Sequence, residues 1–259
     1  MGRPGIGGRG AHERGRGFVV AVVMLAVAVL PLPSAAVVLE ASDAPVGDVP
    51  HNGWHYVRGG RGAVAPPTRP FTAADGRTVH ATAFVPFATV GEITLHHPAA
   101  VVERIGLHQS NHEGARDLAT SDTAAAPVLL PSRGRLSGRH SAADVVVAPD
   151  TEIRSPVTGT VIRAGTYVLY CDHSDDFLVV APDAMPGWEV KVLHIDGVAV
   201  QAGDHVRAGR TVIAPRATVL PFGSQVDDTT ASPSWPHTHI EVIDPSIPNV
   251  PNGGSGSDC

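Results

Sequence analysis

Short apolar runs separated by turn residues recur along the C-terminal half of the chain. Runs rich in Val, Ile and Leu occupy residues 144–148, 152–162, 166–171, 177–181, 188–194 and 211–214. Asp-Asp, Pro-Asp and Pro-Gly pairs lie between several of these runs, and such pairs favour turns. Short strands at this spacing predict a mainly β fold, with an antiparallel β-sheet or barrel-like core.

The pattern is less regular in residues 37–130. Residues 78–87 and 92–96 predict strands, residues 98–106 are compatible with a short helix, and residues 108–117 with a polar loop. The apolar content of the region is too high for a disordered segment. We therefore expect either extra strands on the main domain, which we place at residues 131–248, or a small separate unit.

Residues 1–36 have the three parts of a secretory signal peptide. Four arginines precede an unbroken apolar run at residues 18–30, and Ser34-Ala35-Ala36 supplies small residues for cleavage. The apolar run is short for a membrane span, so an uncleaved anchor is the alternative. We expect an extracytoplasmic protein, secreted or associated with the cell wall, whose only membrane contact would be this segment if it stays uncleaved.

The charge composition restricts the classes of partner that the protein is expected to bind. The chain has 259 residues and a formal net charge of −6, and no run of Lys or Arg follows residue 16. Nucleic acid is therefore not an expected partner.

The two cysteines, Cys171 and Cys259, either form a disulfide after export or stay unpaired. Residues 249–259 read as a flexible Gly/Ser tail that ends in Cys259.

The stretch Trp235–Val242 carries the first chemical signal. In an extended strand alternate side chains share a face, so His237, His239 and Glu241 would point one way and the apolar residues the other. Two imidazoles on one face indicate a metal or proton-transfer site. The alternative is a solvated strand face.

Partners for this face occur upstream. His140 precedes Asp144 by four residues, and His194 ends the predicted strand at 188–194. With His237 and His239 the chain offers four histidines and a carboxylate. Two histidines and one carboxylate with an open fourth position form a catalytic zinc set, and the remaining histidines can transfer protons. We interpret four other histidines as ordinary surface or loop residues rather than a second metal site: His96, His97, His108 and His112.

The order of these motifs resembles a known family. His-x-x-x-Asp at 140–144, a strand-end His at 194 and His-x-His-x-Glu at 237–241 are similar to the lysostaphin-type zinc metallopeptidases, peptidoglycan endopeptidases of the LytM kind. Residues 152–161 resemble the family's strand after the Asp, and residues 200–209 its Val-x-x-Gly-x-x-Val-x-x-Gly hairpin. The resemblance spans residues 136–244 and implies a lysostaphin-type β core with long loops around a groove.

The resemblance also implies roles for individual residues. His140, Asp144 and His239 would bind one zinc ion, with water in the open position. His194 and His237 would activate this water or stabilise the developing oxyanion. Glu241 is left with two interpretations, because it either orients one of the histidines or is a solvated carboxylate.

The implied function is that of an exported, zinc-dependent endopeptidase that hydrolyses amide bonds of peptidoglycan peptides or cross-bridges, acting as a monomer. The alternative is a catalytically inactive LytM-like protein that binds the cell wall or regulates a hydrolase. A third hypothesis is a zinc peptidase that acts on proteins rather than on peptidoglycan.

The chain departs from the usual family pattern at three places. The spacers at 141–143 lack the Gly that the family often has there, and Trp235 stands where the family usually has Gly. This tryptophan either lines the substrate groove or fills the core, and we favour the core. The loop at 215–233 is long, and we expect it to wall or cover the cleft.

Overall fold

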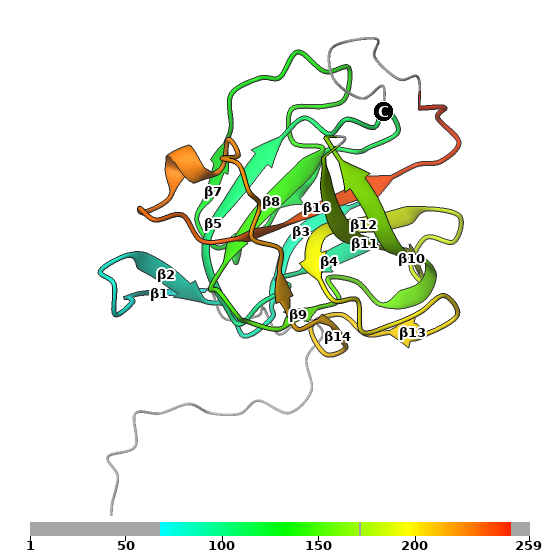
Figure 1. The fold of residues 1–259 in the computed structure, drawn as a ribbon. Coiled ribbons are helices and arrows are strands. Elements are labelled where there is room, and N and C mark those ends of the chain that lie inside the picture. The colour runs from blue at the N-terminus through cyan, green and yellow to red at the C-terminus, as the bar shows by residue number, and fades with distance from the viewer. Residues whose placement is uncertain (1–67, 171, 250–259) are drawn as a thin grey trace, which may run out of the picture. The chain divides into compact units, whose positions relative to one another are not determined.

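The structure is a computed structural model that describes residues 68–170 and 172–249 (Figure 1). The predicted signal peptide, the question of a Cys171–Cys259 bridge and the tail beyond residue 249 lie outside these residues. Within the described part of the chain, no helix has the length and apolar character needed to cross a membrane.

One sheet of 11 strands dominates the fold. Its strands follow the order β1 (Arg69–Thr72), β2 (Thr78–Ala81), β5 (Val101–His108), β8 (Ala142–Val147), β16 (His237–Ile243), β12 (Glu189–Asp196), β11 (His173–Pro182), β10 (Gly159–Leu169) and β13 (His205–Val206). Two short strands attach to this path: β7 (Pro127–Leu129) pairs with β5, and β15 (Arg216–Ala217) pairs with β12. All pairings are antiparallel except β5 with β7. The prediction of a mainly β, antiparallel fold is therefore confirmed, and the sheet is open rather than a closed barrel in the described residues.

Two smaller sheets and one helical turn complete the described fold. The order β4 (Ile93–His96), β3 (Pro86–Val90) and β6 (Ala119–Thr120) forms one small sheet, and β14 (Val212–Ala214) with β9 (Ile153–Arg154) forms the other. The turn η1 (Asp227–Thr229) is a 3₁₀ helix in the long loop before β16.

The expected helix at 98–106 is wrong, because β5 occupies this segment. The strand lies between β2 and β8 and is buried on both faces, so its apolar residues do not alternate with polar ones. Gly106 makes the choice between helix and strand less clear from the sequence, but the packing around this position requires a glycine. A Cβ at this position would lie 2.8 Å from side-chain atoms of Leu130 and of Val226.

Strands from residues 68–130 extend the same sheet as the later strands. In the pairing of β5 with β8, Ile105 lies opposite Val145 and Leu107 opposite Ala143. Of the two alternatives for this region, the structure has extra strands on the main sheet. The boundary drawn at 130/131 falls between β7 and β8.

The central strands β8 and β16 are buried along their whole length. The predicted alternation of β16 is confirmed. Ile240 and Val242 belong to the main hydrophobic core, while His237, His239 and Glu241 line a pocket on the opposite face. The sheet thus holds three polar side chains against a rigid apolar layer.

His97 lies in a loop, as one of the two alternatives for it had it, but its side chain is in the core rather than on the surface. Its ring is fully buried, with its centroid 5.4 Å from that of Phe87. The Nδ1–H donates to the Val85 carbonyl at 2.7 Å, and Nε2 accepts from the backbone N–H of Ala125 at 3.1 Å. Both ring nitrogens are therefore satisfied only when the imidazole is neutral.

Candidate metal centre

Three adjacent strands bring His108, Asp144 and His239 to one point. Asp144 on β8 lies directly opposite His239 on β16 and opposite Gly106 on β5. His108 is two residues beyond Gly106, so it shares the face of Asp144. His108 Nε2 lies 3.0 Å and His239 Nδ1 2.9 Å from Asp144 Oδ1. One possible ligand atom from each residue lies within 4.8 Å of the others.

His140 is not part of this group, and His108 stands in the place that the motif gives to His140. The chain turns at residues 139–140 before β8 begins, and the backbone there is held by a neighbouring segment. The N–H of His140 donates to Asp117 Oδ1 at 3.0 Å, and its carbonyl accepts from Leu118 N–H at 2.9 Å. The interpretation of His108 as an ordinary surface or loop residue is wrong, because His108 is the last residue of β5, is only 2% exposed and belongs to this group.

The hydrogen bonds of His108 show that this group fits a metal ion. Its Nδ1–H donates to the Gln109 carbonyl at 3.0 Å, so Nε2 carries the lone pair in the neutral ring. Nε2 is buried and makes no hydrogen bond within the described residues, although Asp144 Oδ1 is 3.0 Å away. Two facing lone pairs at this distance require a cation, either a proton or a metal. Two imidazole nitrogens and one carboxylate oxygen are ligands that zinc prefers in catalytic sites.

The charges of the group also favour a cation. Burial would raise the pKa of Asp144, but the interactions with His108, His237 and His239 hold it well below its usual range. Burial would lower the pKa of His239, but its hydrogen bonds to Asp144 and Glu241 raise it to about 9. The two ionised carboxylates therefore favour positive charge between them, which a proton on His239 supplies near pH 7.

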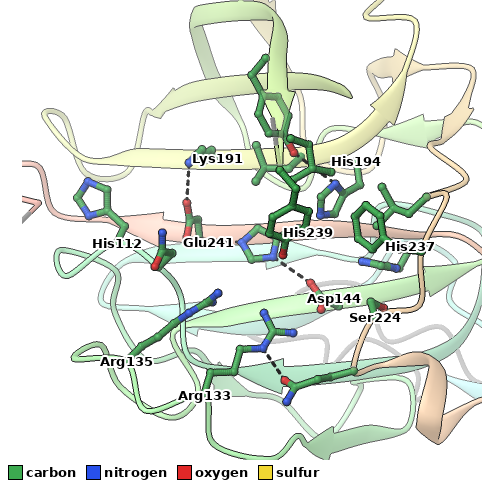
Figure 2. A pocket seen from close by; sticks show the side chains of 18 of the residues that line it. His112, Arg133, Arg135, Asp144, Lys191, His194, Ser224, His237, His239 and Glu241 are labelled. Atoms are coloured by element: carbon green, nitrogen blue, oxygen red, sulfur yellow. Dashed lines mark hydrogen bonds and ion pairs between the residues drawn. The ribbon is translucent and has the colours of Figure 1, made fainter. Parts of the chain in front are cut away.

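Glu241 is a buried, fully engaged carboxylate rather than a solvated one. It accepts a short hydrogen bond from Ser110 Oγ, it lies 3.1 Å from Lys191 Nζ, and only 3% of the residue is exposed. Its Oε2, the oxygen that accepts from Ser110, is also 3.5 Å from His239 Nε2, whereas Lys191 contacts Oε1. Burial would raise the pKa of Glu241, but the contacts with His239 and Lys191 lower it. Glu241 thus lies beside Nε2 of the His239 ring, whose Nδ1 faces Asp144 (Figure 2).

His194 enters the same pocket from a bulge in β12. The pairing of β11 with β12 shifts between Asp176 and Phe177, where Phe177 lies opposite Leu193, and His194 has a positive φ of 60°. In a regular strand neighbouring side chains point to opposite faces, but here both Leu193 and His194 line the pocket. The bulge therefore turns His194 toward the other histidines.

Asp175 holds His194 in one tautomer. The Nδ1–H of His194 donates to Asp175 Oδ2 at 2.6 Å, and the same carboxylate accepts from Tyr167 Oη and Thr218 Oγ1, each at 2.7 Å. Nε2 of His194 is then left as a proton acceptor. An Asp-Asp pair favours a turn, so no signal in the sequence points to this partner. In the structure both Asp175 and Asp176 lie within β11.

His237 completes the cluster. Its ring centroid is 5.2 Å from that of His194, and the centroids of His194 and His239 are 6.1 Å apart. Burial lowers the pKa of His237 to about 4, so this ring is neutral near pH 7. The structure thus brings together four of the residues expected from the motifs, namely Asp144, His194, His237 and His239 (Figure 2). It adds His108 and Asp175 to them.

A pocket of about 660 Å³ opens in front of these residues. The expectation that the 215–233 loop walls the cleft is confirmed, because Leu220 and residues 222–225 line it. Trp235 does not line it. This side chain packs against a small core cluster of Leu130, Val146 and Val226, and the guanidinium of Arg77 lies 4.1 Å from its ring centroid. The structure therefore packs Trp235, partly buried, against this core cluster and not into the groove.

Comparisons with known proteins add little to this geometry. No protein-family profile matches the chain, and no curated protein matches it. Among solved structures it is similar to a zinc-containing peptidase from Vibrio cholerae, with 17% sequence identity and a TM-score of 0.31. This similarity covers 68% of the present chain and 43% of the other.

Proposed function

We propose that the protein is an exported, zinc-dependent endopeptidase that hydrolyses amide bonds of peptidoglycan peptides or cross-bridges. The observation that carries the proposal is the buried His108–Asp144–His239 group. In this group Nε2 of His108 has no hydrogen-bond partner among the described residues and faces the Asp144 carboxylate. His194 and His237 lie beside the group. The resemblance of the motifs to lysostaphin-type peptidases supports peptidoglycan as the substrate. Residues 1–36 support export.

His108, Asp144 and His239 would hold one zinc ion. When bound, zinc supplies Lewis acidity and makes water a nucleophile near neutral pH. His194 accepts the proton of the attacking water at Nε2, and Asp175 stabilises the imidazolium that forms, since their hydrogen bond is 2.6 Å long. His237, neutral and buried, donates a hydrogen bond to the carbonyl oxygen as negative charge develops on it.

The test is metal content together with hydrolysis. Purified full-length protein, loaded with zinc and freed of excess metal, is expected to contain about one zinc per chain by elemental analysis. It is expected to release soluble peptides from cross-linked peptidoglycan, which mass spectrometry identifies. A Gly-rich peptide and an unrelated protein serve as substrates for comparison. Zinc binding with wall binding but no peptide release would reject the peptidase and favour a cell-wall-binding or regulatory protein.

A further inference from the structure

Two arginines in the segment between β7 and β8 line the same pocket as the candidate metal centre. Arg133 and Arg135 are half-buried, and they extend from this segment toward the space in front of Asp144 and Glu241 (Figure 2). Neither arginine forms an ion pair with any carboxylate in the part of the chain that the structure describes. Two guanidinium groups without a counter-ion therefore face the pocket.

The segment that carries them is held in place by Gln109, the residue after His108. Gln109 is buried, and its Oε1 accepts from Ser132 Oγ and from the N–H of Arg133, each at 2.8 Å. Its Nε2 donates to the Arg135 carbonyl at 2.7 Å. These bonds fix both arginine backbones before a ligand arrives, which lowers the entropy lost on binding.

The arginine side chains are also anchored, but only in part. Arg135 Nη1 donates to the Gln109 carbonyl at 2.8 Å, and the same carbonyl accepts from His108 Nδ1. Arg133 Nε donates to Gln225 Oε1 on the opposite loop. A guanidinium has five N–H donors, so each arginine retains donors for a ligand. Arg135 lies one hydrogen-bonded carbonyl away from a candidate metal ligand.

The charges of the side chains that line the pocket favour the binding of an anion. Its charged lining residues other than histidine are Arg133, Arg135, Lys191, Asp144 and Glu241. Lys191 is paired with Glu241, and Asp144 is surrounded by histidines. The positive charge of the two arginines is therefore not neutralised, and a bound divalent cation would increase it further. A planar guanidinium matches the two oxygens of a carboxylate.

We propose that Arg133 and Arg135 form a subsite that binds a carboxylate of the substrate peptide next to the amide bond that is cut. This inference rests on the proposed peptidase function. It defines the substrate class as peptides with a free carboxylate near the cleaved bond. Peptides whose corresponding group is a neutral carboxamide are poorer substrates.

The test compares two forms of one peptide. The bond that the protein cuts in peptidoglycan is first identified by mass spectrometry. A synthetic peptide around this bond is then made with a free carboxylate or with a carboxamide at the neighbouring position. Hydrolysis gives kcat/KM, and calorimetry gives Kd for both forms with zinc-loaded, full-length protein. If no bond is cut, calorimetry uses free-acid and amidated forms of a peptidoglycan cross-link peptide.

We expect the wild-type protein to favour the carboxylate form by roughly tenfold to a hundredfold, as for hydrogen bonds to a charged group. R133Q and R135Q are each expected to lose most of this preference with unchanged zinc content. R135K retains the positive charge but lacks the planar arrangement of donors of a guanidinium, so it is expected to keep part of the preference. The matched control is R139Q, since Arg139 is exposed, lies on the same segment and does not line the pocket.

The outcomes separate the two proposals. Equal Kd values of the two peptide forms for the wild-type protein would overturn the subsite, and so would an undiminished preference in both R133Q and R135Q. An equal loss of activity on both forms in these variants would also overturn it. Hydrolysis of both forms without a preference would support the proposed peptidase function and reject the carboxylate subsite. Preferential binding of the carboxylate form without hydrolysis would support the subsite and reject the peptidase function.

Discussion

Replacing His108 and His140 separately by Ala distinguishes the ligand set of the structure from that of the sequence motif. His108 Nε2 lies 3.0 Å from Asp144 Oδ1 and belongs to the group with His239, while His140 does not. Only the backbone of His140 makes hydrogen bonds within the described residues, and H140A keeps that backbone. We therefore expect H108A to lose the metal and H140A to retain it.

The magnitude follows from the number of ligands. Zinc in four-ligand structural sites is bound with roughly 10–16 kcal/mol, or about 3 kcal/mol per ligand. Removing His108 from a set of three should therefore weaken zinc binding by at least about a hundredfold. A competing chelator of known affinity measures this change at pH 7, and elemental analysis gives the zinc retained after dialysis. Circular dichroism checks that each variant keeps its β structure.

The opposite pattern would refute the geometric assignment. If H140A lost zinc while H108A bound it like the wild type, the motif would have identified the ligand and the structure would not. If both variants kept wild-type affinity, neither histidine would be a ligand. H239A provides the positive control, because His239 belongs to both ligand sets and its loss is expected to weaken binding as strongly as H108A.

Three further predictions follow from other parts of the fold. D175N is expected to keep zinc but to lower kcat at least about a hundredfold, because the tautomer of His194 is no longer fixed; a kcat like that of the wild type would exclude this role. G106A should lower the free energy of unfolding by about 1–3 kcal/mol in urea, since its Cβ would lie 2.8 Å from two side chains, whereas G223A, whose nearest atom is 3.9 Å away, should not. Burial lowers the pKa of His97 to about 4 in the folded state, below its unfolded value of about 6.5. Protons therefore favour unfolding, and His97 should remove roughly 3 kcal/mol of stability as the pH falls from about 6.5 to about 4. Urea titrations across this range should show the loss in the wild type and a flatter profile in H97L.

The strands could be predicted where one face is polar. In β16, His237, His239 and Glu241 alternate with apolar residues, and the sequence assigned their faces correctly. In β5 both faces are buried, and the strand was mistaken for a helix. Alternation is visible only when one face is polar, so a fully buried strand lacks this signal.

The candidate site shows a similar limit. His108 and Asp144 are 36 residues apart, and only the pairing of β5 with β8 brings them together. A local motif such as His-x-x-x-Asp contains no information about this pairing. Asp175 was missed for a related reason, since an Asp-Asp pair favours turns, whereas here one carboxylate is buried against His194.

The pairing of β5 with β8 makes the region before residue 131 part of the candidate site. β5 supplies His108, and the following residue, Gln109, holds the arginine segment. A chain cut at residue 130 would lose both residues and would expose the edge of β8, whose residues are buried in the intact sheet. An unpaired central strand also favours aggregation. The resemblance to lysostaphin-type peptidases begins at residue 136, yet the donor set that the structure assembles begins 28 residues earlier, at His108.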